Sequence, residues 1–429
     1  MAKNNPITVF EHESLSVGEK GFTSAKFEAL KKFYGCGGID KPYFSLINNG
    51  IKFNEYVGVI QIGDTLIEVL PKADKNNGDD SQWRDILIGM MSAVDMFDVH
   101  APSSSQLKIK QNSILDLYFG LFIQEVEYLL HTGLVKQYRK IEGNLTSLKG
   151  RLLFNKHILQ NLLHKERFYV SYTTYDVEHT LHLILYKTIK LLNQINTNAD
   201  LKSKIGSLLL YFPEMADIKV SEALFNKITF NRKTLPYERV VSIARLILLQ
   251  YHPDISSGRN NVLALMFDMN LLWEKFVYHS LIKNQDSAWT VTKQSSKNFW
   301  RLSDSRTSSK IRPDIVIQAK DNDVCVVLDT KWKNLNGNNP SPDDLRQMYA
   351  YHHYYDAKKV ALVYPGSSAS YTPGKYHQSV DGKNDHLDDK ECGILTLAVR
   401  KKVDDENKWT IGLWQKEIKD AVKKSLLCT

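Results

Sequence analysis

The sequence has few cysteines and none of the long apolar runs that mark a membrane protein. Its four cysteines, Cys36, Cys325, Cys392 and Cys428, show no C-x-x-C spacing in 429 residues. We therefore expect neither a zinc site nor a disulfide framework, and a reducing compartment fits. No apolar run reaches the ~18–20 residues that cross a bilayer, and the N-terminus lacks the apolar core of a signal peptide. These absences predict a cytoplasmic protein without membrane contact.

Motifs for nucleotide binding and for base reading are also missing. The chain has no G-x-x-x-x-G-K-[ST] phosphate loop, so we expect it to bind neither GTP nor ATP in that way. No helix-turn-helix or zinc finger stands out, which indicates that recognition of a DNA sequence or of methylation resides in another polypeptide. The net charge of +8 is compatible with binding to DNA phosphates, and equally with a mildly basic protein that binds no nucleic acid.

Length and hydrophobic periodicity predict a multidomain α+β or α/β protein. We expect a β-rich N-terminal domain over residues 1–110, a helical middle domain over 111–258, and a C-terminal domain over 259–429 with a mixed sheet flanked by helices. The first domain contains a predicted hairpin, with strands over 56–62 and 65–70. Apolar residues at helical spacing predict helices over 83–97, 114–130, 178–192 and 239–251.

Charged residues end two apolar strands near position 320. The first strand reads Ile311-Arg-Pro-Asp-Ile-Val-Ile-Gln318, and the second runs from Val324 through Asp329-Thr-Lys331 to Lys333. Charges in strands otherwise built for burial are costly. A bound cation is the usual compensation, so this segment is the candidate active site.

Simple geometry brings these charges together. Asp329 and Lys331 are two residues apart and share a strand face. A hairpin centred between Asp321 and Asn322 puts Asp314 directly opposite Asp329, with Cβ atoms roughly 4.5–5.5 Å apart. Two such carboxylates repel unless a cation lies between them, and oxygen donors without a nearby His or Cys favour Mg²⁺ or Mn²⁺ over zinc.

This arrangement predicts metal-dependent cleavage of a phosphodiester. The metal would hold a phosphate oxygen and acidify a water, while Lys331 would orient that water or stabilise charge on the phosphate. The alternative is a buried ion pair between Lys331 and Asp314 or Asp329, because short patterns are common by chance. The β-branched strands, and Pro313 at a strand start, favour the catalytic interpretation.

Neighbouring segments extend the pattern. Residues 269–282 are apolar at helical spacing, with Glu274 as their single acid, and residues 342–355 form a second predicted helix with Gln347 and Tyr351 on one face. Lys359–Tyr364 is a predicted buried strand. Beyond it we expect a polar loop to Asp389, strands over 391–399 and 408–415, and a basic closing helix over 416–427. The order around the candidate site is helix, strand, hairpin, helix, strand.

This order, with Pro313-Asp314, Asp329-x-Lys331 and Gln347-x-x-x-Tyr351, resembles the PD-(D/E)xK nuclease superfamily, in its branch with a Gln-x-x-x-Tyr helix. The resemblance implies that Glu274 completes a metal site with Asp314 and Asp329, and that Gln347 and Tyr351 support the active site and the DNA backbone. Asp329 stands where many members carry Glu. The flanking residues Arg312 and Lys333 are further candidates for supporting or DNA-binding roles.

The whole chain is also similar to the McrC-type subunit of modification-dependent, McrBC-like restriction systems. Soft matches are Tyr56–Gly63, Leu66–Lys72 and Leu148–Arg151. That resemblance implies a partner, an AAA+ GTPase motor hexamer of the McrB type, which the subunit stimulates while it cuts double-stranded DNA. It also implies that the N-terminal domain binds the partner. The alternatives are a non-cutting adaptor that activates the motor, and a stand-alone DNA repair nuclease.

Overall fold

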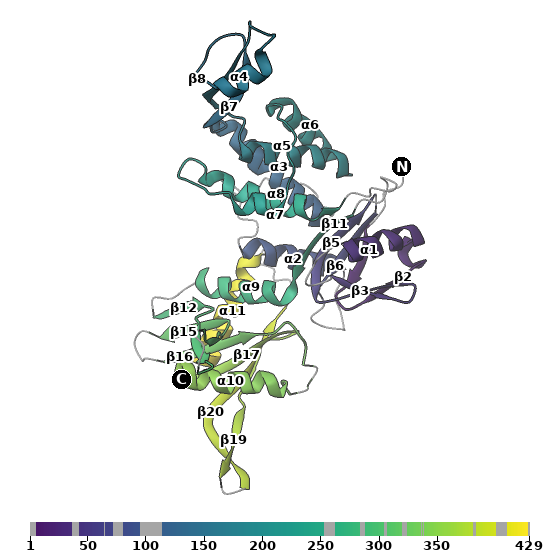
Figure 1. Ribbon diagram of the computed structural model, residues 1–429. Helices are drawn as coiled ribbons and strands as arrows, with labels where there is room; N and C mark the ends of the chain where they lie inside the picture. Colours follow the sequence, from purple (N-terminus) through teal and green to yellow (C-terminus); the bar gives the residue numbers. More distant parts are fainter. Residues whose placement is uncertain are drawn as a thin grey trace. The chain divides into compact units, whose positions relative to one another are not determined.

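The computed structural model describes residues 6–36, 43–63, 65–71, 80–94, 114–252, 262–283, 288–303, 307–319, 324–335, 337, 339–380, 383–399 and 410–427. The chain forms two compact units (Figure 1). Unit 1 contains residues 1–60, 65–98 and 266–429, and unit 2 contains residues 61–64 and 99–265.

Unit 1 joins the two ends of the chain, which differs from the three consecutive domains predicted. Helix α2 (Asp80–Ala93) packs against α9 (Met269–Lys283) and α11 (Ile411–Val422). The indole of Trp332 also donates a hydrogen bond of 2.7 Å to the buried carboxylate of Glu11. These long-range contacts attach the N-terminal segment to the predicted C-terminal domain.

The N-terminal part of unit 1 is rich in strands, as the sequence predicts. Its elements are β1 (Ile7–Phe10), β2 (Ser14–Ser16), η1 (Glu19–Gly21), α1 (Ser24–Cys36), β3 (Phe44–Ile47), β4 (Gly50–Phe53), β5 (Tyr56–Ile62) and β6 (Thr65–Leu70). Strands β5 and β6 have the predicted bounds and lie side by side in a sheet, where β1 pairs with β6 in parallel. Every residue of β5 is buried, so this strand is covered on both faces.

Unit 2 contains helices and a small antiparallel sheet. The elements here are α3 (Ile114–Thr132), β7 (Gln137–Leu145), β8 (Arg151–Leu152), α4 (Phe154–Asn161), β9 (Phe168–Asp176), α5 (Thr180–Ile195), α6 (Ala199–Tyr211), α7 (Glu222–Asn226), η3 (Leu235–Tyr237), α8 (Glu238–Leu249) and β10 (Tyr251–His252), with β11 (Val262–Asp268) crossing into unit 1. The predicted helices over 114–130, 178–192 and 239–251 are confirmed as α3, α5 and α8. The prediction of a helical middle domain missed its sheet, in which β7 pairs with β9 along its whole length and β8 pairs with β9 as well.

The C-terminal part of unit 1 is a mixed sheet, as predicted. Its elements are β12 (Trp289–Lys293), β13 (Lys297–Trp300), β14 (Ser309–Ile311), β15 (Ile315–Ala319), β16 (Cys325–Thr330), α10 (Pro342–Tyr355), β17 (Lys359–Gly366), β18 (Ser370–Thr372), β19 (Lys375–Val380), β20 (Lys383–Ala398), and the π-helix η4 (Lys423–Leu427) after α11. The strand order is β12-β15-β16-β17-β20-β18. Strand β15 is antiparallel to β16, while β17 is parallel to both β16 and β20. Strands β13 and β14 pair separately, and β19 pairs with β20.

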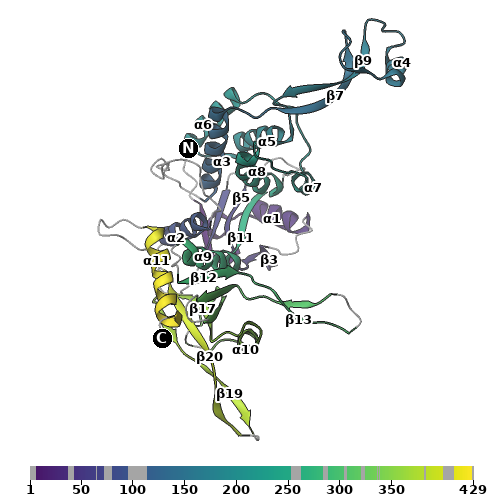
Figure 2. The same ribbon diagram turned by 90° about the vertical axis from the view of Figure 1, so that its left-hand side faces the viewer.

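Helices cover both faces of this sheet (Figure 2). Met348 and Tyr351 of α10 pack on Val327 and Leu362 of the sheet. On the opposite side, Trp414 of α11 lies 4.5 Å from Phe276 of α9, ring centre to ring centre. Helix α10 begins where its sequence predicts, because Ser341 caps it through a hydrogen bond from the Asp344 backbone and Pro342 takes the first helical position.

Two predictions in the C-terminal segment are wrong. Ile411 begins a helix and is not part of a strand over 408–415, because Trp414, Ile418 and Val422 recur at helical spacing and are buried. Residues 408 and 409 lie outside the described residues. The polar segment 365–389 contains β18, β19 and the start of β20, where long cross-strand pairing replaces the predicted loop. No helix within the described ranges is both long and apolar enough to span a membrane.

Candidate active site

The predicted hairpin register is confirmed. Ile315 of β15 pairs with Leu328 of β16, so Asp314 and Asp329 form the next opposed pair in that register. Asp314 precedes β15, and Asp329 is the penultimate residue of β16 with 2 % of its surface exposed. The backbone after β16 stays beside the sheet, because Lys331 N–H donates to the Val363 carbonyl at 2.9 Å. Lys331 therefore keeps the face that Asp329 occupies.

Asp314 is fixed by the end of the neighbouring strand. Its Oδ2 accepts hydrogen bonds from the Thr330 backbone N–H at 2.7 Å and from the Thr330 hydroxyl at 2.8 Å. Two donors on one oxygen hold the direction of the carboxylate. Thr330 has no place in the motif that identified the site, so this role was missed from sequence.

Asp329 is a buried carboxylate with one ionic partner. Its Oδ2 lies 2.8 Å from Lys331 Nζ, so the ion pair of the alternative interpretation is present. Burial nevertheless raises the pKa of Asp329 to about 6, and the charge of Asp314 adds to this effect while Lys331 opposes it. The ammonium thus offsets only part of the cost of burying two neighbouring carboxylates.

Two side chains of helix α10, Gln347 and Tyr351, approach the Oδ1 atom of Asp329. Gln347 Nε2 donates to Tyr351 Oη at 2.7 Å and lies 3.4 Å from Asp329 Oδ1. Tyr351 Oη donates to the Arg312 carbonyl at 3.1 Å and lies 3.5 Å from the same Asp329 oxygen. Tyr351 is fully buried, and this burial together with Asp329 raises its pKa. These contacts place both side chains beside Asp329, while their supporting role stays a prediction.

Glu274 of α9 reaches the same region through an intermediary. Gln294 Nε2 donates to Glu274 Oε1 at 2.8 Å, and Gln294 N–H donates to the Asp314 carbonyl at 2.9 Å. Burial raises the pKa of Glu274, and the charge of Asp314 raises it further. Gln294 has a φ of 50°, which brings its backbone and its side chain to the two acids. No sequence signal marked Gln294.

The remaining predicted residues lie at the edge of this group. Arg312 is exposed directly before Pro313 and Asp314. Lys333 pairs with Asp344, with 2.6 Å between Nζ and Oδ2, and Asp344 also lies 3.6 Å from Lys331 Nζ. Asp344, in the first turn of α10, thus contacts both lysines.

The donor set suits a hard divalent cation in its chemistry. Asp314, Asp329 and Glu274 offer only carboxylate oxygens, and the buried Asp329 Oδ2 has Lys331 Nζ as its ionic partner at 2.8 Å. As they lie, no three His, Cys, Asp or Glu side chains among the described residues form a metal-binding group. The three acids therefore fit a cation by charge and ligand type, and the predicted Mg²⁺ or Mn²⁺ site stays a prediction.

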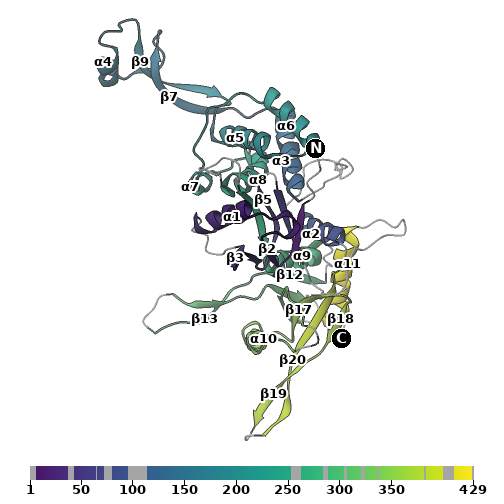
Figure 3. The same ribbon diagram turned by 90° about the vertical axis from the view of Figure 1, so that its right-hand side faces the viewer.

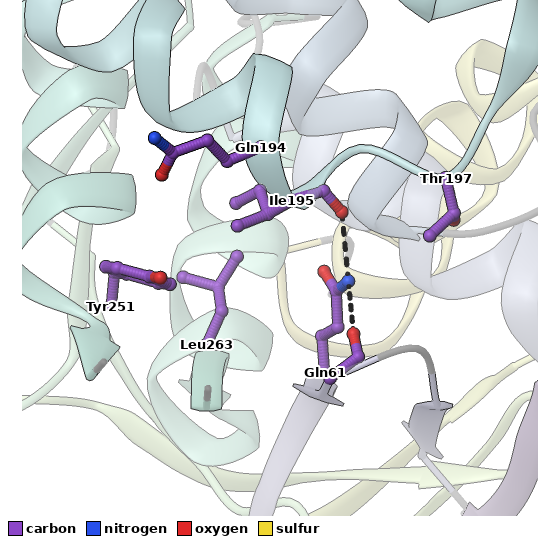
Figure 4. A pocket seen from close by; sticks show the side chains of 7 residues that line it. Gln61, Gln194, Ile195, Thr197, Tyr251 and Leu263 are labelled. Carbon is purple, nitrogen blue, oxygen red and sulfur yellow. Dashed lines mark hydrogen bonds between the residues drawn. The ribbon is translucent and has the colours of Figure 1, made fainter. Parts of the chain in front are cut away.

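Unit 2 contains a cavity, and none of the predicted site residues is among the residues that line it. It has a volume of ≈ 270 Å³ and is lined by Gln61, Gly63, Gln194, Ile195, Thr197, Tyr251 and Leu263 (Figure 4). Gln61 Nε2 donates to the carbonyls of Ile195 and Gly63, each at 3.0 Å. The described residues in its wall include no carboxylate, lysine or histidine, so they do not offer the chemistry predicted for the active site.

Comparison with known proteins finds a matching family and two similar solved structures. The sequence profile of the McrBC family, described as McrBC 5-methylcytosine restriction system component, matches residues 51–365, a range that includes every predicted site residue. A solved structure described as a refined half-complex from the tetradecameric assembly of Thermococcus gammatolerans McrB AAA+ hexamers with bound McrC has a similar chain. The two chains are 18 % identical and superpose with a TM-score of 0.65, and the match covers 98 % of this chain and 99 % of that one.

A second structure is described as the cryo-EM structure of the Thermococcus gammatolerans McrBC complex. It is 19 % identical, covers 66 % of this chain and 88 % of that one, and gives a TM-score of 0.47. No curated protein matches the chain. At these identities, the likeness to the first structure shows a shared fold.

Proposed function

The chain belongs to the McrBC family of 5-methylcytosine restriction system components, and on this premise we propose that it is the DNA-cleaving subunit of a GTP-driven restriction complex. The resemblance to this family predicted from the sequence is confirmed. Its membership of the PD-(D/E)xK nuclease superfamily is part of the proposal. The supporting observation is the group formed by Asp314, Asp329 and Lys331 where the adjacent strands β15 and β16 meet at one end, with Gln347 and Tyr351 in contact with Asp329.

The energetics of Asp329 carry the proposal. Two carboxylates that face each other in buried strands contribute nothing to packing, because each negative charge raises the free-energy cost of ionising the other. The pKa of Asp329, raised by burial and by Asp314 to about 6, expresses that cost. Such frustration is typical of sites that bind a cation or react, where the cost is offset when the ligand arrives.

The chain's own residues then have distinct roles. Asp314, Asp329 and Glu274 would hold Mg²⁺ or Mn²⁺, which when bound supplies a Lewis acid for the phosphate and acidifies a water. Lys331 would donate from Nζ to that water, or to the phosphate oxygen on which negative charge builds. Gln347 and Tyr351 would keep Asp329 oriented through their contacts with its Oδ1.

Nucleotide hydrolysis would belong to a partner. The chain has no phosphate loop, and the similar solved chain comes from an assembly of McrB AAA+ hexamers with bound McrC. We propose that this chain binds an equivalent AAA+ GTPase hexamer, stimulates it, and cuts double-stranded DNA. The predicted partner-binding role of the N-terminal segment is part of the same proposal.

Cleavage by the reconstituted complex tests this function. Wild-type chain, partner motor, GTP and Mg²⁺ should cut methylated plasmid DNA, and EDTA should stop the cutting. Asp329→Ala should abolish cleavage while circular dichroism and partner pull-down stay unchanged. The matched control is Asp343→Ala, an aspartate on α10 whose side chain is 88 % exposed; it should cut like wild type.

Two results would count against the proposal. Cutting by Asp329→Ala at the wild-type rate would remove this site from the chemistry. A wild-type chain that stimulates GTP hydrolysis but never cuts DNA would identify the non-cutting adaptor, and in that case Lys331→Ala should leave the stimulation unchanged.

A further inference from the structure

Strands β13 and β14 form a hairpin with an unusual surface. They pair with each other and not with the main sheet, and Figures 2 and 3 show β13 projecting away from that sheet. All four residues of β13 are exposed, including Phe299 at 48 % and Trp300 at 58 %. An isolated strand pair has little stability in water. Large aromatic side chains left in solvent on such a pair indicate a surface that is covered by a ligand.

The described residues in and around this hairpin carry charge of one sign, although the sequence between the two strands also contains Asp304. The described residues 288–303 and 307–313 contain five basic side chains and no Asp or Glu. The five are Lys293, Lys297, Arg301, Lys310 and Arg312. Most of the chain mixes its 56 basic and 48 acidic residues, so this run stands apart from the average. A basic surface interleaved with aromatics is complementary to the phosphates and sugars of a nucleic acid.

The hairpin is continuous with the candidate active site. Gln294, between β12 and β13, hydrogen-bonds both to Glu274 and to the Asp314 backbone. At the other end, β14 leads through Arg312 and Pro313 into Asp314. Whatever the hairpin binds therefore lies next to the reacting carboxylates.

The base of the hairpin is anchored on α10. Lys297 Nζ donates to the Tyr354 carbonyl at 2.7 Å, Tyr354 Oη donates to the Phe299 carbonyl at 3.3 Å, and the rings of Phe299 and Tyr354 lie 5.2 Å apart. These contacts fix the direction of the hairpin, while Trp300, Arg301 and Lys310 stay exposed beyond them. A pre-oriented arm loses little conformational entropy on binding.

We propose that the β13–β14 hairpin is a DNA-binding arm that grips duplex DNA beside the phosphodiester to be cut. This inference rests on the proposed nuclease function, and it adds a surface that the carboxylate motif does not contain. The major groove of B-DNA is wide enough to admit a two-stranded β-ribbon. Arg301 and Lys310 contact phosphates, and Trp300 packs against the sugars and base edges that a groove exposes.

Binding measured without metal isolates this surface from catalysis. The full-length chain is titrated in EDTA against a fluorescent 30-base-pair duplex, and anisotropy gives the affinity at several salt concentrations. The double variant Arg301→Gln, Lys310→Gln should lower the slope of log K against log salt by about 2, roughly 1 for each lost phosphate contact. Trp300→Ala should weaken binding at least about 5-fold, as at an interface hot spot, with little change in the slope.

Matched controls come from exposed side chains of unit 2. Lys202→Gln with Lys227→Gln removes the same charge, and Tyr211→Ala removes an aromatic side chain that is 74 % exposed. Both controls should bind DNA like wild type. Hairpin variants with wild-type affinity and salt dependence would overturn the inference. So would variants that bind DNA normally but fail to pull down the motor, because the hairpin would then be a protein-binding surface.

Single-stranded DNA offers the same phosphates and sugars, so a single-stranded 30-mer is titrated in parallel with the duplex. If the variants lost affinity only for that strand, the assignment to duplex DNA would be wrong. Asp329→Ala should bind the duplex like wild type. A wild-type chain that binds DNA through the hairpin but never cuts it would contradict the proposed nuclease function and still support the DNA-binding hairpin. The two proposals can therefore fail separately.

Discussion

Neutralising Asp329 should stabilise the metal-free protein while it destroys cleavage. The perturbation is Asp329→Asn, which keeps the shape of the side chain and removes its charge. Asp329 is almost completely buried, faces Asp314, and has Lys331 as its ionic partner. Its pKa is raised by burial and by Asp314 from 3.8 to about 6. Because an acid with a raised folded-state pKa ionises more easily after unfolding, the charge favours the unfolded chain at neutral pH.

The size of this effect follows from the shift. A change of about two pKa units corresponds to roughly 3 kcal/mol at pH 7.5, at 1.36 kcal/mol per unit. The shift already includes the attraction of Lys331, so no further correction is needed for the lost ion pair. The cost is absent below about pH 4, grows as the pH rises, and is complete above about pH 6. For a unit of this size the expected increase in Tm at pH 7.5 is about 4–10 °C.

A second aspartate supplies a control of opposite sign. Burial would raise the pKa of Asp344, but hydrogen bonds from Lys333 and Ser341 lower it below its usual value. Asp344→Asn should therefore lower Tm at neutral pH, although it makes the same chemical change beside the same lysine.

Thermal unfolding in EDTA at pH 7.5 and pH 5.0, followed by tryptophan fluorescence, measures both variants. The gain from Asp329→Asn should shrink at pH 5.0. The reasoning is refuted if Asp329→Asn is no more stable than wild type at pH 7.5, or if both variants shift Tm in the same direction.

Three further predictions concern ligand, support and pH. Mg²⁺ should raise the Tm of wild type more than that of Asp329→Asn, because bound cation stabilises the folded state by mass action; equal shifts in a thermal scan would contradict binding at this site. Tyr351→Phe removes the donor to the partly buried Arg312 carbonyl and should cost about 1–3 kcal/mol in urea unfolding, with a lower cleavage rate; full activity would exclude a positioning role. Burial lowers the pKa of His182 to about 4, with His179 acting in the same direction. The neutral form of a histidine with a depressed pKa stabilises the fold fully above about pH 6.5 and progressively less as the pH falls through 4. The free energy of unfolding of wild type should therefore decrease by about 2 kcal/mol between pH 7.5 and 5. That of His182→Gln should decrease less, and an equal decrease in urea titrations would refute the assignment.

Local pattern was sufficient for the elements around the candidate site. Helix α10 and strands β5, β6 and β17 begin where periodicity and capping predict them. The hairpin register, with Ile315 opposite Leu328, follows from loop symmetry and the alternation of side chains. These features depend on residues close together in the chain, which is why the spacing of Asp314, Asp329 and Lys331 could be read from it.

Local pattern was insufficient where partners come from far along the chain. Residues 411–415 satisfy a strand pattern, but the buried position of Trp414 against Trp273 and Phe276 makes them helical. Segment 365–389 is polar enough for a loop, and pairing with β20 turns much of it into strands. In both cases burial against a distant element outweighs local propensity.

The sequence by itself determined the family of the chain and pointed to the candidate site residues, because charges in apolar strands, helical spacing and a family profile are written in residue order. Only the tertiary structure decided how those residues are held: Gln294 links Glu274 to Asp314, Thr330 fixes Asp314, and Asp344 sits between two lysines. It also decided that Glu11 and Trp332 meet across the chain. The physical reason is that hydrogen bonds and buried charges act through distances of a few ångströms in space, and a sequence fixes such distances only between near neighbours.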